Sequence, residues 1–124
     1  MKLIHAIIRK VLKRDPRVIF AYLYGSSIDE EHPRDIDIGV YISRKEDFLK
    51  VSSELKVALS RATDISPDQF DIQVINKADN LLYLERVLNG RILVDKNPDL
   101  RGIFIESFSM RYREAEGILR EAFF

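Results

Sequence analysis

The sequence predicts an α/β or α+β sandwich, and three observations indicate this fold class. Apolar residues recur at helical spacing in four segments, and four short segments are rich in β-branched and aromatic residues. Their order along the chain is helix, strand, strand, helix, strand, helix, strand, helix. No internal repeat, low-complexity tract or linker divides the 124 residues, so we assign residues 1–124 to a single domain.

The composition excludes several classes of protein. There is no cysteine, which excludes disulfides, cysteine-based zinc sites and thiol catalysis. Because 20 Lys and Arg residues balance 20 Asp and Glu residues, we expect no direct nucleic-acid binding. No apolar run approaches the roughly 20 residues that cross a bilayer, and charges interrupt the N-terminal segment too early for a signal peptide. We therefore expect a cytoplasmic protein without membrane contact. The sequence leaves open whether the protein forms a homo-oligomer.

The first half of the chain predicts two helices that flank two strands. The apolar stripe from Leu3 to Leu12 indicates a helix, which ends at Asp15-Pro16. Residues Val18 to Tyr24 are nearly all apolar, as in a strand buried on both faces. Residues Asp35 to Ile42 alternate as a strand, and helical spacing resumes from about Glu46 to Thr63. In the alternating strand, one face carries Ile36, Ile38 and Val40 and the other carries Asp35, Asp37 and Gly39.

The second half predicts a strand over Phe70 to Val74 and a short helix over Leu81 to Leu88. We expect Asn89-Gly90 to close that helix as a left-handed cap. Arg91 to Val94 indicates a fourth, short strand. After Asn97-Pro98 a last helix runs toward Phe124. The apolar stripe expected on this helix comprises Phe104, Phe108, Tyr112, Ala115 and Leu119.

Three carboxylates are the candidates for chemistry. Asp35 and Asp37 share one face of a strand, with Cα atoms roughly 6–7 Å apart, and they repel each other unless a cation lies between them. Carboxylates at this spacing can converge on two metal ions, and hard oxygen ligands favour Mg²⁺ or Mn²⁺. Asp71, on the face of its strand away from Ile72 and Val74, would complete the ligand set or accept a proton from a nucleophile. The alternative is an amphipathic strand with a solvated acidic face and an ordinary Asp at a strand entry.

Gly25-Ser26-Ser27 directly follows the first predicted strand. A glycine at the end of a strand allows a sharp turn and a close approach of backbone N–H groups to a phosphate. The two serines add hydroxyl donors, so this segment is a candidate nucleotide-binding turn. A simple turn in which a serine caps a helix is the alternative.

Together these segments resemble a known family. Tyr24-Gly25-Ser26, followed by Asp35-Ile36-Asp37-Ile38-Gly39-Val40, is similar to the signature of the polymerase-β-type nucleotidyltransferases. In size the chain resembles the minimal nucleotidyltransferases, the MNT antitoxins of prokaryotic HEPN/MNT toxin–antitoxin pairs. The segments Phe70 to Asn76 and Leu88 to Asp95 match that family's third-carboxylate strand and its helix–glycine–strand ending.

The resemblance implies a nucleotidyltransferase fold, with a small mixed sheet of about four strands backed by helices. It implies that Gly25 and Ser26 hold the triphosphate of ATP and that Asp35 and Asp37 bind both metal ions. Asp71 would complete the catalytic metal site. In the toxin–antitoxin branch, AMP is transferred from ATP to a tyrosine of the HEPN ribonuclease partner, which is thereby silenced.

The loop between the turn and the first aspartate departs from the family pattern. Many members continue with Ala-Arg-Gly or Ala-Lys-Gly and place a serine before the first aspartate. Here residues 28–34 form a shorter, acidic loop, and Arg34 precedes Asp35. Acidic residues near a triphosphate oppose its binding, whereas Arg34 could offer a positive charge or simply lie at the surface.

Three functions therefore remain open. The first is an active enzyme that modifies a partner toxin. The second is an antitoxin that neutralises its toxin by contact, with weak or lost catalysis. The third is transfer to a small molecule. The small size of the chain favours an acceptor on another molecule, and an exposed part of the last helix's apolar stripe would suggest a protein partner.

Overall fold

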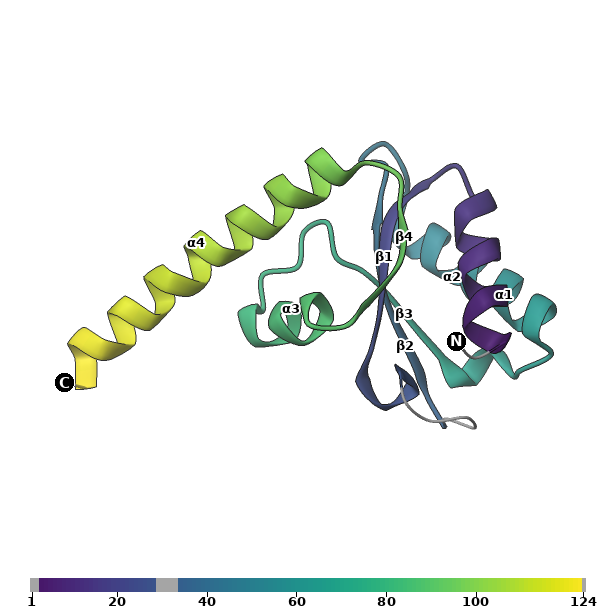
Figure 1. Ribbon diagram of the computed structural model, residues 1–124, viewed down its shortest axis with the longest axis horizontal. Coiled ribbons are helices and arrows are strands. Elements are labelled where there is room, and N and C mark those ends of the chain that lie inside the picture. Colours follow the sequence, from purple (N-terminus) through teal and green to yellow (C-terminus); the bar gives the residue numbers. More distant parts are fainter. Residues whose placement is uncertain (1–2, 29–33, 124) are drawn as a thin grey trace.

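The computed structural model describes residues 3–28 and 34–123, and its elements follow the predicted order (Figure 1). The helices and strands begin and end close to the predicted residues. Their bounds are α1 Leu3–Arg14, β1 Val18–Tyr24, β2 Ile36–Ile42, α2 Phe48–Thr63, β3 Phe70–Val74, α3 Leu81–Leu88, β4 Arg91–Asp95 and α4 Pro98–Phe123. Two short 3-10 turns, η1 at Gly25–Ile28 and η2 at Pro67–Gln69, precede β2 and β3.

The strands form one mixed sheet in the order β3-β2-β1-β4. Strand β1 pairs antiparallel with β2 and with β4, whereas β2 and β3 run parallel. Helix α2 connects the two parallel strands, as a crossover between parallel strands requires. The expected α+β architecture with a four-stranded mixed sheet is confirmed.

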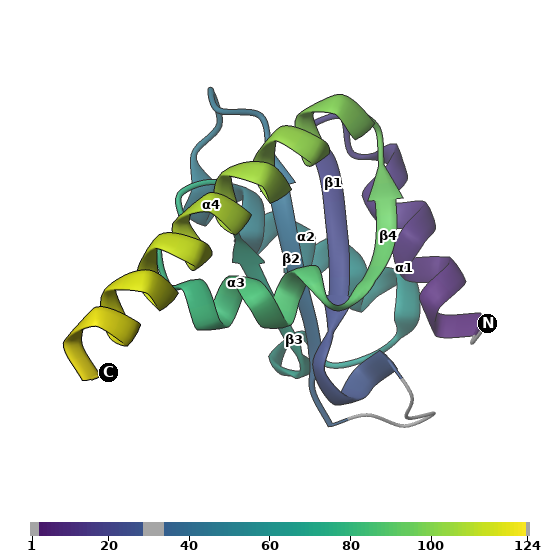
Figure 2. The same ribbon diagram turned by 60° about the vertical axis from the view of Figure 1, so that its left-hand side comes forward.

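Helices cover both faces of the sheet. Figures 1 and 2 show α1 and α2 on one face and α3 with the first part of α4 on the other. On the second face the core is aromatic: the rings of Phe20 and Tyr41 stack with centroids 4.6 Å apart, and Phe104 of α4 meets both rings edge-on. Strand β1 is therefore buried on both sides, as its apolar sequence predicts.

Helix α4 is 26 residues long, and its distal half projects away from the rest of the molecule (Figure 1). Phe104 and Phe108 pack against the core, which confirms the first part of the predicted stripe. Leu119, assigned to the same stripe, is 57% exposed because the helix has left the sheet before this residue. Within the described ranges, no helix has an apolar stretch long enough to cross a membrane.

The predicted left-handed cap at Asn89-Gly90 is wrong. Asn89 ends α3 in a right-handed helical conformation (φ −84°), and within the described residues Gly25 is the one glycine with positive φ. Gly90 is needed for space instead, because a Cβ there would clash with the carbonyl oxygen of Leu23. The left-handed cap occurs at Asp64, where α2 ends and the backbone N–H donates to the carbonyl of Ser60.

Candidate functional site

The parallel register of β2 and β3 brings two of the three candidate carboxylates together. The Cα of Asp37 pairs with the Cα of Asp71, and neighbouring strands lie about 4.8 Å apart. Both side chains are on the face that carries α3. Asp35 lies just before β2, two residues from Asp37, and is exposed. The three carboxylates therefore gather at the end of the sheet where β2 and β3 begin.

The charges of these groups act on one another. Asp37 is half-buried, and burial raises the pKa of its carboxyl above the usual value. The negative charges of Asp71 and Asp35 raise this pKa further, and the positive charge of Arg86 opposes them. Burial and the neighbouring negative charges disfavour the ionised carboxylate of Asp37, so a bound cation would stabilise that ionised form.

The donors at this end of the sheet fit a hard divalent cation in type but are not assembled around one point. Within residues 3–28 and 34–123, no three Asp, Glu or His side chains lie close enough to hold a single ion. The carboxylate of Asp71 instead accepts a hydrogen bond of 2.8 Å from the side-chain amide of Gln73. Asp35 and Asp71 are both exposed. The oxygen-only donor set matches the preference of Mg²⁺ and Mn²⁺.

The candidate nucleotide-binding turn lies directly against Asp37. Gly25 has a φ of 77°, a backbone conformation that favours glycine. A Cβ at Gly25 would stand 2.6 Å from Oδ2 of Asp37, so only glycine lets the turn pass this close to the carboxylate. Ser26 and Ser27 follow in η1, and the side chain of Ser26 is exposed. The turn and the carboxylates thus form one continuous site.

The loop that departs from the family pattern, residues 28–34, is described only at its two ends. Residues 29–33, which carry its acidic residues and His32, lie outside the described residues. Arg34 is exposed, and its carbonyl accepts a hydrogen bond of 3.4 Å from the side chain of Gln69. No ion pair joins Arg34 to Asp35 or to any other residue that the structure describes.

Three further residues line the site: Tyr24, which belongs to the signature but was given no role, and Tyr83 and Arg86, which the sequence patterns did not single out. The hydroxyl of Tyr24 donates a hydrogen bond of 3.2 Å to that of Tyr83, and burial raises the pKa of both phenols. The carboxylates of Asp37 and Asp71 raise these two pKa values further. The guanidinium of Arg86 lies 5.9 Å from the centre of the Tyr24 ring. Tyr83 and Arg86 come from α3, so only the packing of this helix on the sheet brings them to the carboxylates.

Comparison with known proteins gives one family and several similar structures. The family described as Polymerase beta, Nucleotidyltransferase matches residues 7–99, which include every candidate site residue named above. No curated protein matches the chain.

Three solved structures share the fold. A mutant of the MntA–HpeT toxin–antitoxin with two aspartates replaced by glutamate has 21% identity and a TM-score of 0.69, over 95% of this chain and 97% of that one. A toxin–antitoxin with AMP-PNP has 22% identity and a TM-score of 0.68 over the same shares. An MntA–HpeT mutant with a tyrosine replaced by alanine has 23% identity and a TM-score of 0.67, over 93% and 94% of the two chains.

Proposed function

This chain belongs to the polymerase beta nucleotidyltransferase family, and from that premise we propose that it transfers AMP from ATP to a tyrosine of a helical HEPN-type toxin and so acts as its antitoxin. The observation that carries the proposal is the alignment of Asp37 with Asp71 on parallel strands, beside the Gly25 turn. Acidic oxygen ligands next to a glycine turn that can hold phosphates are what nucleotidyl transfer requires. The reaction would take place in the cytoplasm, where ATP is available.

Asp35 and Asp37 would hold the divalent ions, and Asp71 would complete the set after its side chain turns from Gln73. Bound Mg²⁺ or Mn²⁺ would neutralise charge on the phosphates and at the attacking oxygen. Two observations support this assignment: the donors are all hard oxygens, and the pKa of Asp37 is raised by the neighbouring carboxylates. The AMP-PNP in one structurally similar toxin–antitoxin is consistent with ATP as the nucleotide.

The side chains of the chain itself have distinct roles in the proposed transfer. The Gly25 turn and Ser26 would hold the triphosphate, and Arg86 would supply positive charge beside the carboxylates. The phenol oxygen of the acceptor would form a bond to the α-phosphorus while the bond to pyrophosphate breaks. A neutral phenol with a pKa near 10 is a poor nucleophile, so Asp71 would accept its proton.

The acceptor would come from the partner protein. Beyond the core-facing residues of its first half, α4 carries large apolar side chains in solvent: Met110 is 50% exposed, Ile118 67% and Leu119 57%. Apolar side chains on a projecting helix favour a protein partner. The toxin–antitoxin context of the similar structures supports the same class of partner.

Two other functions compete with this one. An antitoxin that works by contact alone is favoured by two observations: the carboxylates are not assembled around one ion, and the acidic loop departs from the family pattern. A small-molecule acceptor is the third function, and the exposed face of α4 argues against it.

Intact-mass spectrometry of the partner separates these functions. We would mix the chain with its cognate helical partner, ATP and Mg²⁺, and compare wild type with Asp71→Asn and with Asp68→Asn. Asp68 is an exposed aspartate in η2 and serves as the matched control. We expect AMP-sized additions with wild type and Asp68→Asn but not with Asp71→Asn. A tight complex without a mass change, under conditions where ATP binds, would instead establish the contact-only antitoxin.

A further inference from the structure

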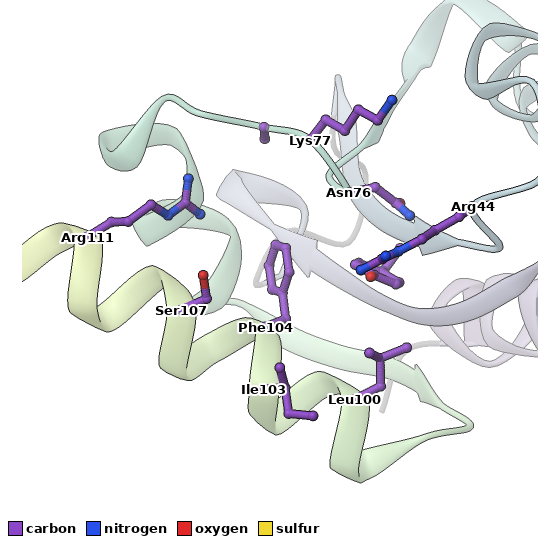
Figure 3. A pocket seen from close by; sticks show the side chains of 10 residues that line it. Arg44, Asn76, Lys77, Leu100, Ile103, Phe104, Ser107 and Arg111 are labelled. Carbon is purple, nitrogen blue, oxygen red and sulfur yellow. The ribbon is translucent and has the colours of Figure 1, made fainter.

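A cavity lies on the same face of the sheet as the carboxylates but at the opposite end of β2. It has a volume of about 390 Å³ and opens between the first half of α4, the segment after β3 and the turn after β2 (Figure 3). This volume is within the range of about 300–1,000 Å³ that is usual for small-molecule sites.

Three of the side chains around this cavity carry positive charge. Arg44, Lys77 and Arg111 line it, and among the residues that the structure describes no acidic residue does. Within the part of the chain that the structure describes, neither Arg44 nor Arg111 forms an ion pair. The Nε of Arg111 is buried and has no hydrogen-bond partner. Since buried polar groups are almost always satisfied, this donor is available to an oxygen of a bound molecule.

The guanidinium groups approach the cavity from two sides. In Figure 3, Arg111 rises from α4 on one side of Phe104, and Arg44 enters from the other side. The ammonium of Lys77 lies 5.6 Å from the centre of the Phe48 ring, so it contributes charge from the rim. Two separated guanidinium groups suit the oxygens of a phosphate, which arginine binds in a bidentate manner.

Apart from the polar groups of Asn76 and Ser107, the remaining lining is aromatic or aliphatic. The rings of Phe104 and Tyr41 meet edge-on with centroids 5.4 Å apart, and Leu100 and Ile103 extend this surface along α4. Inorganic phosphate alone would leave this surface uncovered. An organic phosphate would cover it with its apolar part while its phosphate meets the arginines.

Helix α3 separates this cavity from the carboxylates. Asp37, Gly39 and Tyr41 follow one another on the same face of β2. Gly39 is the middle one of these three residues, and a Cβ there would stand 2.8 Å from the side chain of Val87. Helix α3 therefore packs directly on the strand at Gly39. Asp37 and Tyr41 are four residues apart on β2, which corresponds to roughly 13 Å. A ligand in the cavity and a nucleotide at the carboxylates would therefore lie on opposite sides of α3.

We propose that this cavity binds a small aromatic organic phosphate of the nucleoside monophosphate class, at a second site that is independent of the carboxylates. Arg111 and Arg44 bind the phosphate, Ser107 adds a hydroxyl donor, and Phe104 contacts the ring. Because the site needs no metal ion, its occupancy does not depend on the proposed transfer reaction.

The probe is AMP in the presence of EDTA, measured by isothermal titration calorimetry, with adenosine and inorganic phosphate as comparison ligands. We expect AMP to bind wild type and Asp37→Asn equally, which separates this site from the transfer site. Adenosine and inorganic phosphate should each bind at least tenfold more weakly, because each lacks one half of the recognition. Rising salt should weaken AMP binding, since the interaction is between charges.

Two variants and a matched control test the residues. Arg44→Gln and Arg111→Gln should each weaken AMP binding by roughly tenfold, the loss expected when a charged hydrogen bond to phosphate is removed. Arg113→Gln removes an exposed arginine from the same helix that does not line the cavity, and it should leave the affinity unchanged. Arg44 is exposed, so its variant tests the site even if Arg111→Gln perturbs the fold.

Several outcomes would overturn the proposal. The first is no binding of AMP to wild type, and the second is loss of AMP binding in Asp37→Asn. If Arg113→Gln weakens AMP binding equally, the binding depends on the general positive charge of the protein and not on this cavity. Inorganic phosphate that binds as tightly as AMP would mean a simple anion site. If Arg44→Gln and Arg111→Gln weaken a protein complex while AMP does not bind, the cavity is a protein-docking site instead.

Discussion

Oδ2 of Asp37 lies 2.6 Å from the position that a Cβ on Gly25 would occupy, so the turn after β1 and the carboxylate on β2 are fitted to each other. Tyr24, the residue before the turn, is also the register partner of Asp37. Any side chain at Gly25 must therefore displace the carboxylate or the turn. This contact makes the turn and the carboxylate one unit of the proposed site.

We predict that Gly25→Ala lowers the free energy of unfolding by about 1–2 kcal/mol, because an L-residue is strained at positive φ. The clash with Asp37 should add to this loss and impair nucleotide binding. Gly102→Ala is the matched control: nothing lies within 4 Å of its Cβ, and α4 should gain about 0.5–1 kcal/mol. Urea denaturation measures both. A Gly25→Ala variant as stable as wild type would contradict the close fit.

ATP binding at the carboxylate site should require Mg²⁺ or Mn²⁺, because Asp35, Asp37 and Asp71 would repel a triphosphate on their own. Titration of ATP into the protein with and without EDTA measures this, and the Arg111→Gln variant reduces the contribution from the cavity beside α4. Equal affinity in EDTA in that variant would rule out a metal site at the carboxylates.

Asp37→Asn should abolish transfer and, without metal, leave the fold at least as stable as wild type. The pKa of Asp37 is raised above its unfolded value of 3.8. At a pH near these two pKa values, the native state therefore binds more protons than the unfolded state. The stability that Asp37 contributes is complete below pH 3.8 and is lost as the pH rises through the folded pKa. The advantage of Asn should therefore grow with pH and then level off.

Urea denaturation in EDTA at a series of pH values tests this prediction, with the exposed Asp68→Asn as the control. A large loss of stability in Asp37→Asn at neutral pH would mean that Asp37 is a structural hydrogen-bonding residue. The catalytic assignment of Asp37 would then fail.

Arg86→Gln should weaken the binding of ATP with Mg²⁺ severalfold, because Arg86 supplies positive charge beside Asp37. The same change should raise the pKa of Asp37 further, since the opposing charge is lost. The matched control is Arg61→Gln, an exposed arginine in the last turn of α2. Calorimetry measures the affinity, and NMR titration of the Asp37 carboxyl in metal-free protein measures the pKa. If both quantities are unchanged, Arg86 has no part in the site.

Asp15→Asn should lower the free energy of unfolding by about 1–2 kcal/mol near neutral pH, as expected for a charged hydrogen-bonded pair that is partly buried. Arg17 binds the Asp15 carboxylate through Nε at 3.0 Å and Nη2 at 2.8 Å. This hydrogen bonding lowers the pKa of Asp15 below 3.8, so its contribution is present above pH 3.8 and is lost as the pH falls through the folded pKa.

The difference between Asp15→Asn and wild type should therefore vanish in strong acid. Glu54→Gln is the control, because Glu54 contacts the same arginine at 3.4 Å and is more exposed, so its loss should cost less than about 1 kcal/mol. A difference between Asp15→Asn and wild type that does not change with pH would contradict the ion pair as its cause.

The sequence by itself determined the order, type and approximate bounds of every helix and strand. It could do so because each element buries one face, or both, and burial imposes a period of two or 3.6 residues on the apolar positions. The same period placed Asp35 and Asp37 on one face of a strand, and Asp71 on the face opposite Ile72. Gly25 was found because a glycine directly after a buried strand allows a sharp turn and a close approach of the backbone to a phosphate.

Only the tertiary structure decided which strands are neighbours and in what register. The pairing of Asp37 with Asp71 depends on contacts between strands that are joined through a helix, and no local pattern encodes that register. Packing also decided the conformation at Gly90, where the carbonyl of Leu23 leaves no room for a side chain. Likewise, Arg86 reaches the carboxylates and Arg111 faces Arg44 across a cavity only because α3 and α4 cross the sheet where their apolar faces are buried.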